Sequence, residues 1–302
     1  MIDVLDVTKR YGRTTVVDGL RFTVEPGRVT GFLGPNGAGK STTMRMIGGL
    51  DAPTAGRVTV AGRAYAEHDA PLRTLGMLLE AGAAHPGRTA EAHLRALAAA
   101  GSLPRRRVDD VLAMVGLQSA AGTRVGTFSL GMRQRLGIAT ALLGDPAAVL
   151  LDEPVNGLDP DGVRWLRELL RGLAAEGRTV LVSSHLMSEM TLTADHLVII
   201  GAGRLIADEP LEAFVRRAGD GVVEVRSPDA AALRNLLLGP GVTVSASRPG
   251  VLEVAGLDVE TIAARAAGAG VPVHGLTPRT ASLEEAFMEL TRTASEYRSV
   301  PR

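Results

Sequence analysis

Residues 34–41, GPNGAGKS, restrict the possible folds of this chain more than any other feature. They follow the apolar run VTGFLG, which predicts a buried strand, and they precede STTMRMIGGL, which predicts a helix. A glycine-rich turn between a strand and a helix is the arrangement of a phosphate-binding loop. Its glycines let successive backbone N–H groups point at a phosphate, at the positive end of the helix dipole. A merely flexible glycine turn would need neither Lys40 nor Ser41 at its end.

This loop predicts a site for ATP and Mg²⁺. Lys40 is expected to reach the β- and γ-phosphates, the hydroxyl of Ser41 to bind magnesium, and Thr42 to donate to a phosphate. The predicted ATP contacts of the loop are Gly34, Pro35, Asn36, Gly37, Ala38, Gly39, Lys40, Ser41 and Thr42.

Two adjacent carboxylates end a second apolar run, AVLLDEP, at residues 148–154. Open α/β sheets bind their ligands at the carboxyl ends of strands, so these groups are placed to act on a bound nucleotide. Asp152 is expected to hold magnesium, and Glu153 to take a proton from the attacking water. Such a run can also be an ordinary solvated strand end, but its place behind a phosphate loop favours the catalytic interpretation.

The remaining patterns predict an α/β chain with two domains, at residues 1–218 and 219–302. IDVLDV and LRFTV predict an antiparallel N-terminal β subdomain, and helical spacing predicts a helical subdomain at about 80–145. AAVLLDEP and RTVLVSSH predict buried parallel strands, and DHLVIIGAGRLIADEP predicts a hairpin. In the second domain the order β, α, β, β, α, β, with the last strand in VPVHGL, is that of a ferredoxin-like α+β fold. SLEEAFMELT predicts a final amphipathic helix.

Composition narrows the functional classes. The formal net charge is zero, so no basic footprint for nucleic acid is present. The longest apolar stretch, residues 136–151, is interrupted by Asp145 and Pro146, which argues against a membrane span. The N-terminus has no apolar signal-peptide region, and the chain has no cysteine. A cytoplasmic protein is the expectation.

With these motifs the chain resembles the ATPase subunit of ABC transporters over about residues 2–215. In FSLGMRQR, Ser129 and Gly131 match the family signature sequence, which in the family contacts the γ-phosphate from the opposite subunit. Leu130 and Met132 depart from its commonest form and agree with subunits of the daunorubicin and bacitracin resistance exporters. A C-terminal LEEAF-like helix is similar to that subtype as well.

Four single residues extend the resemblance. Tyr11 in KRYG resembles the aromatic residue that stacks on adenine, although it could be an exposed turn tyrosine. Asp159 in NGLDP resembles the D-loop, and His185 after VLVSS resembles the switch histidine rather than a structural one. Glu80 in GMLLEAG stands where the family usually has glutamine. We hypothesise that Glu80 ligates magnesium and couples it to the membrane partner, with an altered magnesium dependence.

The resemblance also implies the partners. Two ATPase subunits, as a homodimer or heterodimer, would bury ATP between Lys40 of one and the signature of the other. A separately encoded membrane permease would carry the cargo, a drug or lipid-like molecule in the leading interpretation, and no nucleic acid partner is expected. The subunit would lie at the cytoplasmic face of the cell membrane. The alternatives are an importer subunit and a soluble ABC ATPase that acts on ribosomes or DNA.

Overall fold

The computed structural model describes residues 1–80, 82–184, 187–219, 222–278 and 287 of the 302. The chain divides into two compact units, and the second begins at Glu212, within the helix α8 (Leu211–Gly219). Each unit has its own apolar core. Within the described ranges, no helix is both long and apolar enough to span a membrane.

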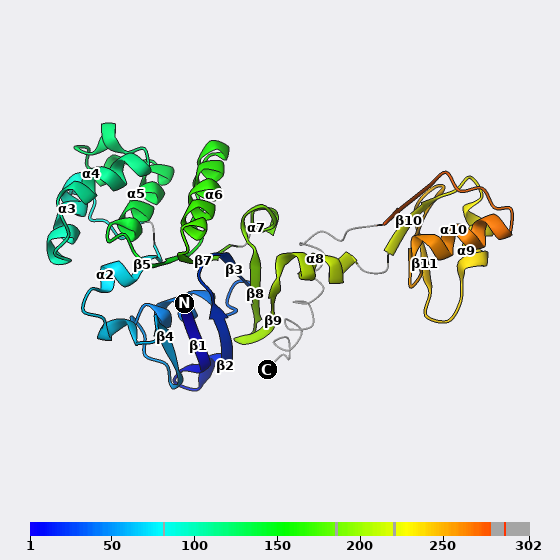
Figure 1. Cartoon of the computed structure of the whole chain (residues 1–302), viewed down its shortest axis with the longest axis horizontal. Coiled ribbons are helices and arrows are strands. Elements are labelled where there is room, and N and C mark those ends of the chain that lie inside the picture. Colours follow the sequence, from blue (N-terminus) through cyan, green and yellow to red (C-terminus); the bar gives the residue numbers. More distant parts are fainter. Residues whose placement is uncertain (81, 185–186, 220–221, 279–286, 288–302) are drawn as a thin grey trace. The chain divides into compact units, whose positions relative to one another are not determined.

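A six-stranded sheet in the order β5-β6-β7-β3-β8-β9 forms the centre of the first unit (Figure 1). Its strands are β3 (Val29–Leu33), β5 (Leu75–Leu78), β6 (Ala148–Leu151), β7 (Thr179–Ser183), β8 (His196–Gly201) and β9 (Arg204–Pro210). Five strands run parallel and β9 pairs antiparallel with β8, which confirms the mostly parallel core and the predicted hairpin. β3, β6 and β7 are buried along their whole length, and because they pair in parallel, their carboxyl ends lie at one edge of the sheet.

A three-stranded antiparallel sheet, in the order β2-β1-β4, forms the predicted N-terminal β subdomain. Its strands are β1 (Ile2–Tyr11), β2 (Thr14–Val24) and β4 (Ala55–Val60). β1 and β2 are longer than the runs IDVLDV and LRFTV indicated. β4 was not predicted, because half of its residues are exposed, only Val60 is buried, and this edge strand has little hydrophobic pattern.

Helices connect the strands of the first unit. They are α1 (Lys40–Ile47), the short α2 (Pro71–Thr74), α3 (Ala90–Ala100), α4 (Arg106–Met114), α5 (Leu130–Leu142), α6 (Pro160–Ala175) and α7 (Met187–Thr193). α3, α4 and α5 gather into the expected helical subdomain, and α5 packs on β5 (Figure 1).

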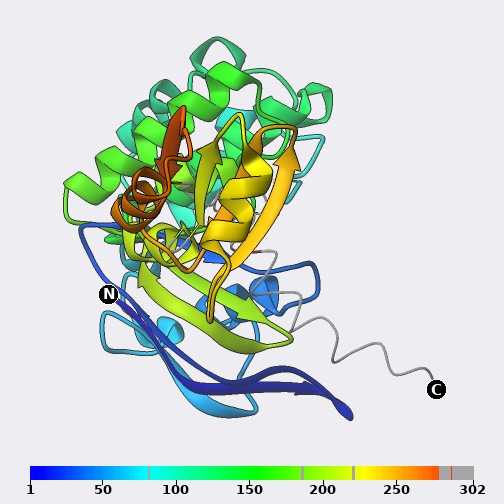
Figure 2. The ribbon, with the colours of Figure 1, turned by 90° about the vertical axis from the view of Figure 1, so that its right-hand side faces the viewer.

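The second unit has the predicted ferredoxin-like order. It contains β10 (Val222–Arg226), α9 (Ala230–Leu237), β11 (Thr243–Arg248), β12 (Val251–Ala255), α10 (Val259–Gly268) and β13 (Gly275–Pro278). The strand order is β11-β12-β10-β13, and the apolar sides of the two helices pack with the sheet (Figure 2, yellow to orange).

The last strand of this unit was placed wrongly by the sequence. β13 begins at Gly275, whereas VPVHGL covers residues 271–276. Pro272 has no backbone N–H to give to a strand ladder, and pairing with β10 starts only beyond it. The predicted helix at 282–291 lies outside the described residues, apart from Phe287.

Candidate active site

The phosphate loop and the acidic pair line one cavity of about 250 Å³. Its lining residues are Val16, Asn36, Gly37, Gly39, Lys40, Ser41, Thr42, Asp152 and Glu153. The structure thus brings together residues that are more than a hundred positions apart in the sequence, because β3 and β6 both end at the same edge of the sheet.

The loop backbone needs two of its glycines for different reasons. Gly39, the residue before α1, has φ of 103°, which favours glycine. A Cβ on Gly34 would lie 2.5 Å from the carbonyl oxygen of Ile200, so there is no room for a side chain. Between them Ala38 is buried and its N–H donates to Pro35 O at 3.1 Å. The N-terminus of α1 consequently faces the cavity, where its dipole favours an anion.

Lys40 is only 7% exposed, and its ammonium folds back over the loop. Nζ donates to Gly34 O at 2.5 Å and to Pro35 O at 3.3 Å. Burial lowers the pKa of Lys40, while the nearby carboxylates of Glu153 and Asp152 oppose that shift. This partly desolvated cation can exchange its two carbonyl acceptors for the oxygens of a phosphate.

Asp152 is held from two sides. Ser41 Oγ donates to Asp152 Oδ2 at 2.8 Å, and Ser183 Oγ, at the end of β7, donates to Oδ1. Ser183 was not among the predicted site residues. The signal that could have found it is a polar residue at the end of the apolar run VLVS, on the strand next to β6.

The donors at this point fit a magnesium ion. A serine hydroxyl beside one carboxylate is an all-oxygen set, and Mg²⁺ is typically bound by one or two carboxylates together with substrate phosphates. Among the described residues no cluster of three or more His, Cys, Asp or Glu forms a metal cage.

Glu153 has a strained backbone. Its φ is 49°, in the left-handed region that non-glycine residues rarely adopt. Hydrogen bonds hold this conformation: Glu153 N donates to Ser183 Oγ at 2.9 Å, and Glu153 O accepts from Gln134 Nε2 at 3.3 Å and from Asn156 N at 3.2 Å. Strain that is maintained by the surrounding structure is common at active sites. Gln134 lies in the segment FSLGMRQR, but the sequence did not single it out.

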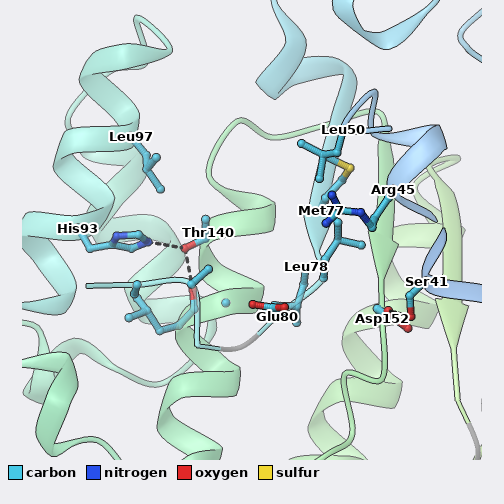
Figure 3. Close-up of a pocket in the computed structure, with 15 residues that line it drawn as sticks. Ser41, Arg45, Leu50, Met77, Leu78, Glu80, His93, Leu97, Thr140 and Asp152 are labelled. Atoms are coloured by element: carbon cyan, nitrogen blue, oxygen red, sulfur yellow. Dashed lines mark hydrogen bonds between the residues drawn. The ribbon is translucent and has the colours of Figure 1, made fainter. Parts of the chain in front are cut away.

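Glu80 lies in a neighbouring groove of about 590 Å³ (Figure 3). The groove is lined by Glu80, Arg45, apolar residues such as Leu97, and the cavity residues Ser41 and Asp152. It therefore adjoins the predicted magnesium position, and Glu80 is exposed. His93 in the same groove contacts Thr140 Oγ1 through Nε2 at 3.3 Å, and burial lowers the pKa of that histidine.

The signature and D-loop residues are at helix starts outside the cavity. Ser129 caps α5 by accepting from Met132 N at 3.2 Å, and Asp159 caps α6 by accepting from Gly162 N at 2.9 Å. Neither Ser129 nor Gly131 is among the described residues that line the cavity of Lys40. Tyr11 is also outside that lining, at the end of β1, and is 49% exposed. His185 lies outside the described residues.

Comparisons with known proteins agree on one family for the first unit. A family described as ABC transporter matches residues 17–156, and a domain of unknown function matches residues 221–284. The bacitracin transport ATP-binding protein BcrA of Bacillus licheniformis is 42% identical over 220 residues, 72% of each chain. The Nod factor export ATP-binding protein I of Ralstonia nicotianae is 36% identical over 300 residues, 96% of this chain and 94% of the relative. The dimeric structure of MJ0796, a bacterial ABC transporter cassette, is similar with a TM-score of 0.65 at 26% identity. The match covers 70% of this chain and 99% of the MJ0796 chain.

Proposed function

This chain belongs to the ABC transporter ATP-binding subunits, and from that premise we propose that it powers export of a drug or lipid-like molecule through a separate permease. ATP binding and hydrolysis are the activity of the family. The observation that carries the assignment to this chain is the convergence of Lys40, Ser41, Asp152 and Glu153 on one cavity.

The proposed roles follow from the contacts of these side chains. Lys40 and the N–H groups of the loop hold the β- and γ-phosphates. Ser41 and Asp152 hold Mg²⁺, which when bound neutralises developing charge on the phosphate oxygens. Glu153, fixed through its backbone by Ser183 and Gln134, orients the attacking water and accepts its proton. His185 is proposed to assist at the γ-phosphate.

The site is proposed to be completed by a second subunit. Ser129 and Gly131 lie at the exposed start of α5 and do not line the cavity of their own chain. A second ATPase subunit related by a two-fold axis can present the same helix start to the γ-phosphate, with Asp159 close to the contact. ATP would then hold the dimer closed, and hydrolysis would release it.

The permease is proposed to contact the groove that contains Glu80. This groove shares Ser41 and Asp152 with the nucleotide cavity, so a partner seated there lies next to the predicted magnesium ligands (Figure 3). We further propose that residues 1–218 act as the ATPase domain at the inner face of the cell membrane. Residues 219–302 would serve as an accessory domain for dimer contact or regulation.

A pull-down from native membranes tests this assignment. A tagged Glu153→Gln variant, incubated with ATP and magnesium, is expected to recover a polytopic membrane protein, identified by mass spectrometry. A matched Glu153→Gln/Glu80→Arg variant, which reverses the charge at position 80, is expected to recover less of it. Recovery of ribosomal or DNA-bound proteins in place of a permease would contradict the transport role. A permease accompanied by a soluble substrate-capturing protein would indicate an importer.

The role of Glu80 has a separate test. Glu80→Gln restores the amide usual in the family and removes one charge beside Ser41 and Asp152. We expect the magnesium concentration for half-maximal ATP hydrolysis to change. Unchanged magnesium dependence together with unchanged transport would show that Glu80 neither ligates the metal nor couples it to the permease.

A further inference from the structure

The hydroxyl of Tyr11 is tied to the helix that follows the phosphate loop. Tyr11 Oη donates to Asp51 Oδ2 at 3.1 Å, and the same oxygen accepts a hydrogen bond from Arg45 Nε at 2.7 Å. Arg45 belongs to α1, whose first residue is Lys40. Two hydrogen bonds therefore connect the phenol to the element that carries the phosphate cradle.

A second contact holds the ring of Tyr11 from one face. Lys9 Nζ lies 5.0 Å from the ring centroid, within the range of a cation–π interaction. The same ammonium donates to Ala52 O at 2.6 Å, so it is anchored to the residue after Asp51. Asp51 thus fixes the hydroxyl of Tyr11 directly. Ala52 fixes Lys9, which in turn lies over one face of the ring. About half of the Tyr11 surface, 49%, remains exposed to solvent.

Asp51 is a strong acceptor at this position. The hydrogen bond from Arg45 foremost, together with that from Tyr11, holds the pKa of the Asp51 carboxyl below its ordinary value. The carboxylate is therefore ionised near neutrality, and both of its hydrogen bonds are charge-assisted. Its side chain is 19% exposed and that of Arg45 is 48% exposed, so solvent reaches this pair.

We propose that Asp51 is a positioning residue for the base of the nucleotide: with Arg45 it fixes the plane of Tyr11 at a set distance from the phosphate loop. This inference rests on the proposed function and on the resemblance of Tyr11 in KRYG to the aromatic residue that stacks on adenine. A ring that is already oriented loses little conformational freedom when a base stacks on it, so the hydroxyl contact raises affinity without touching the ligand.

Binding of ATP and of inorganic tripolyphosphate to the full chain, both with magnesium and measured by calorimetry, separates base from phosphate recognition. Asp51→Ala and Tyr11→Phe keep the ring and release only its orientation, so each is expected to weaken ATP binding by about 3-fold, less than the roughly 10-fold of a lost aromatic contact. Neither change should alter the affinity for tripolyphosphate, which has no base. Because both variants break the same hydrogen bond, the double variant should be little weaker than either single one.

Other results overturn the inference in distinguishable ways. If Tyr11→Ala weakens ATP binding but Asp51→Ala and Tyr11→Phe do not, the positioning role fails while the proposed role of the ring stands. If Tyr11→Ala has no effect on ATP, the ring does not bind the base and both ideas fail. Equal weakening of both ligands in Asp51→Ala would make Asp51 a structural residue only. Asp6→Asn is the matched control: it weakens the exposed Asp6–Arg21 pair of the same sheet and should change neither affinity.

Discussion

Ser183 in the first unit and Ser227 in the second are both buried, and each uses its hydroxyl once as donor and once as acceptor. Ser183 Oγ donates to the carboxylate of Asp152 and accepts from Glu153 N at 2.9 Å. Ser227 Oγ donates to Pro272 O at 2.7 Å and accepts from Asp229 N at 3.1 Å. Ser183 thereby orients two carboxylate residues in a cavity, whereas Ser227 joins two turns.

The same contrast holds for the charged groups of the two units. The first unit buries the ammonium of Lys40 and keeps Glu153 at a φ of 49°. In the described part of the second unit, Ser227 is the one buried polar residue, and pairs such as Arg226–Glu224, at 3.2 Å, lie on the surface. Desolvated charge and backbone strain are both common at reactive sites, and among the described residues Lys40 and Glu153 combine them in one cavity of the first unit.

The largest expected effect is on the chemical step. Glu153→Gln should lower ATP hydrolysis by about 10²- to 10⁴-fold, because the water loses its proton acceptor, while ATP binding is retained. Phosphate release and nucleotide affinity measure the two separately. Glu224→Gln makes the same exchange on the second unit and should leave hydrolysis unchanged. A loss of hydrolysis in Glu224→Gln would contradict the placement of the chemistry in the first unit alone.

Removing apolar volume from the core of the second unit should destabilise that unit alone. Leu252→Ala empties a site that is 2% exposed, and should lower the free energy of unfolding by about 2–5 kcal/mol. Thermal unfolding of the full chain measures this change, and ATP hydrolysis below the transition should stay at the wild-type rate. Leu238→Ala, at a leucine 50% exposed, is the control and should cost less than about 0.5 kcal/mol. A parallel loss of hydrolysis in Leu252→Ala would show that the two units are energetically coupled.

The two buried serines give the closest matched pair. Ser183→Ala and Ser227→Ala should each lower the free energy of unfolding by about 1–3 kcal/mol, since each leaves buried groups without their partner. Only Ser183→Ala should also weaken magnesium-dependent hydrolysis, by about 10- to 100-fold, as expected for a residue that orients a metal ligand. A magnesium titration of the rate distinguishes the two variants. Equal rates in both would mean that Asp152 does not depend on Ser183.

The smallest expected effect concerns acid stability. Arg178, which donates to Asp145 Oδ1 at 2.8 Å, holds the pKa of Asp145 below its usual 3.8. A carboxyl with a lowered folded-state pKa stabilises the protein above 3.8, and that contribution is lost as the pH falls through the lowered pKa. Because the side chain is 58% exposed, Asp145→Asn should cost less than about 1 kcal/mol near neutrality. Unfolding curves measured at several pH values should show the free energies of the variant and the wild type converging in acid. A difference that grows as the pH falls would contradict a lowered pKa of Asp145 in the folded state.

Local sequence spacing determined much of this protein. The phosphate loop, Asp152 and Glu153 were found because each motif lies within a few residues of the strand end that exposes it. The order of elements in the second unit was recognisable because its strands and helices alternate with clear apolar periods. β13 was placed a few residues early, since one proline outweighed the apolar pattern. The roles of all predicted site residues and the domain boundaries stay predictions, including the roles of Lys40, Ser41, Asp152 and Glu153, which the structure brings to one cavity.

Tertiary structure alone decided which side chains act together. Ser41 meets Asp152 across 111 positions, Ser183 reaches it across 31, and Tyr11 reaches Asp51 across 40. Such contacts leave no local periodicity, because they arise where separate strands end at a common sheet edge or where a turn lies beside a helix. The sequence by itself determined that the chain binds a triphosphate. The sheet order and the left-handed backbone of Glu153 decided how the residues around the triphosphate are held, and neither can be predicted from residue spacing.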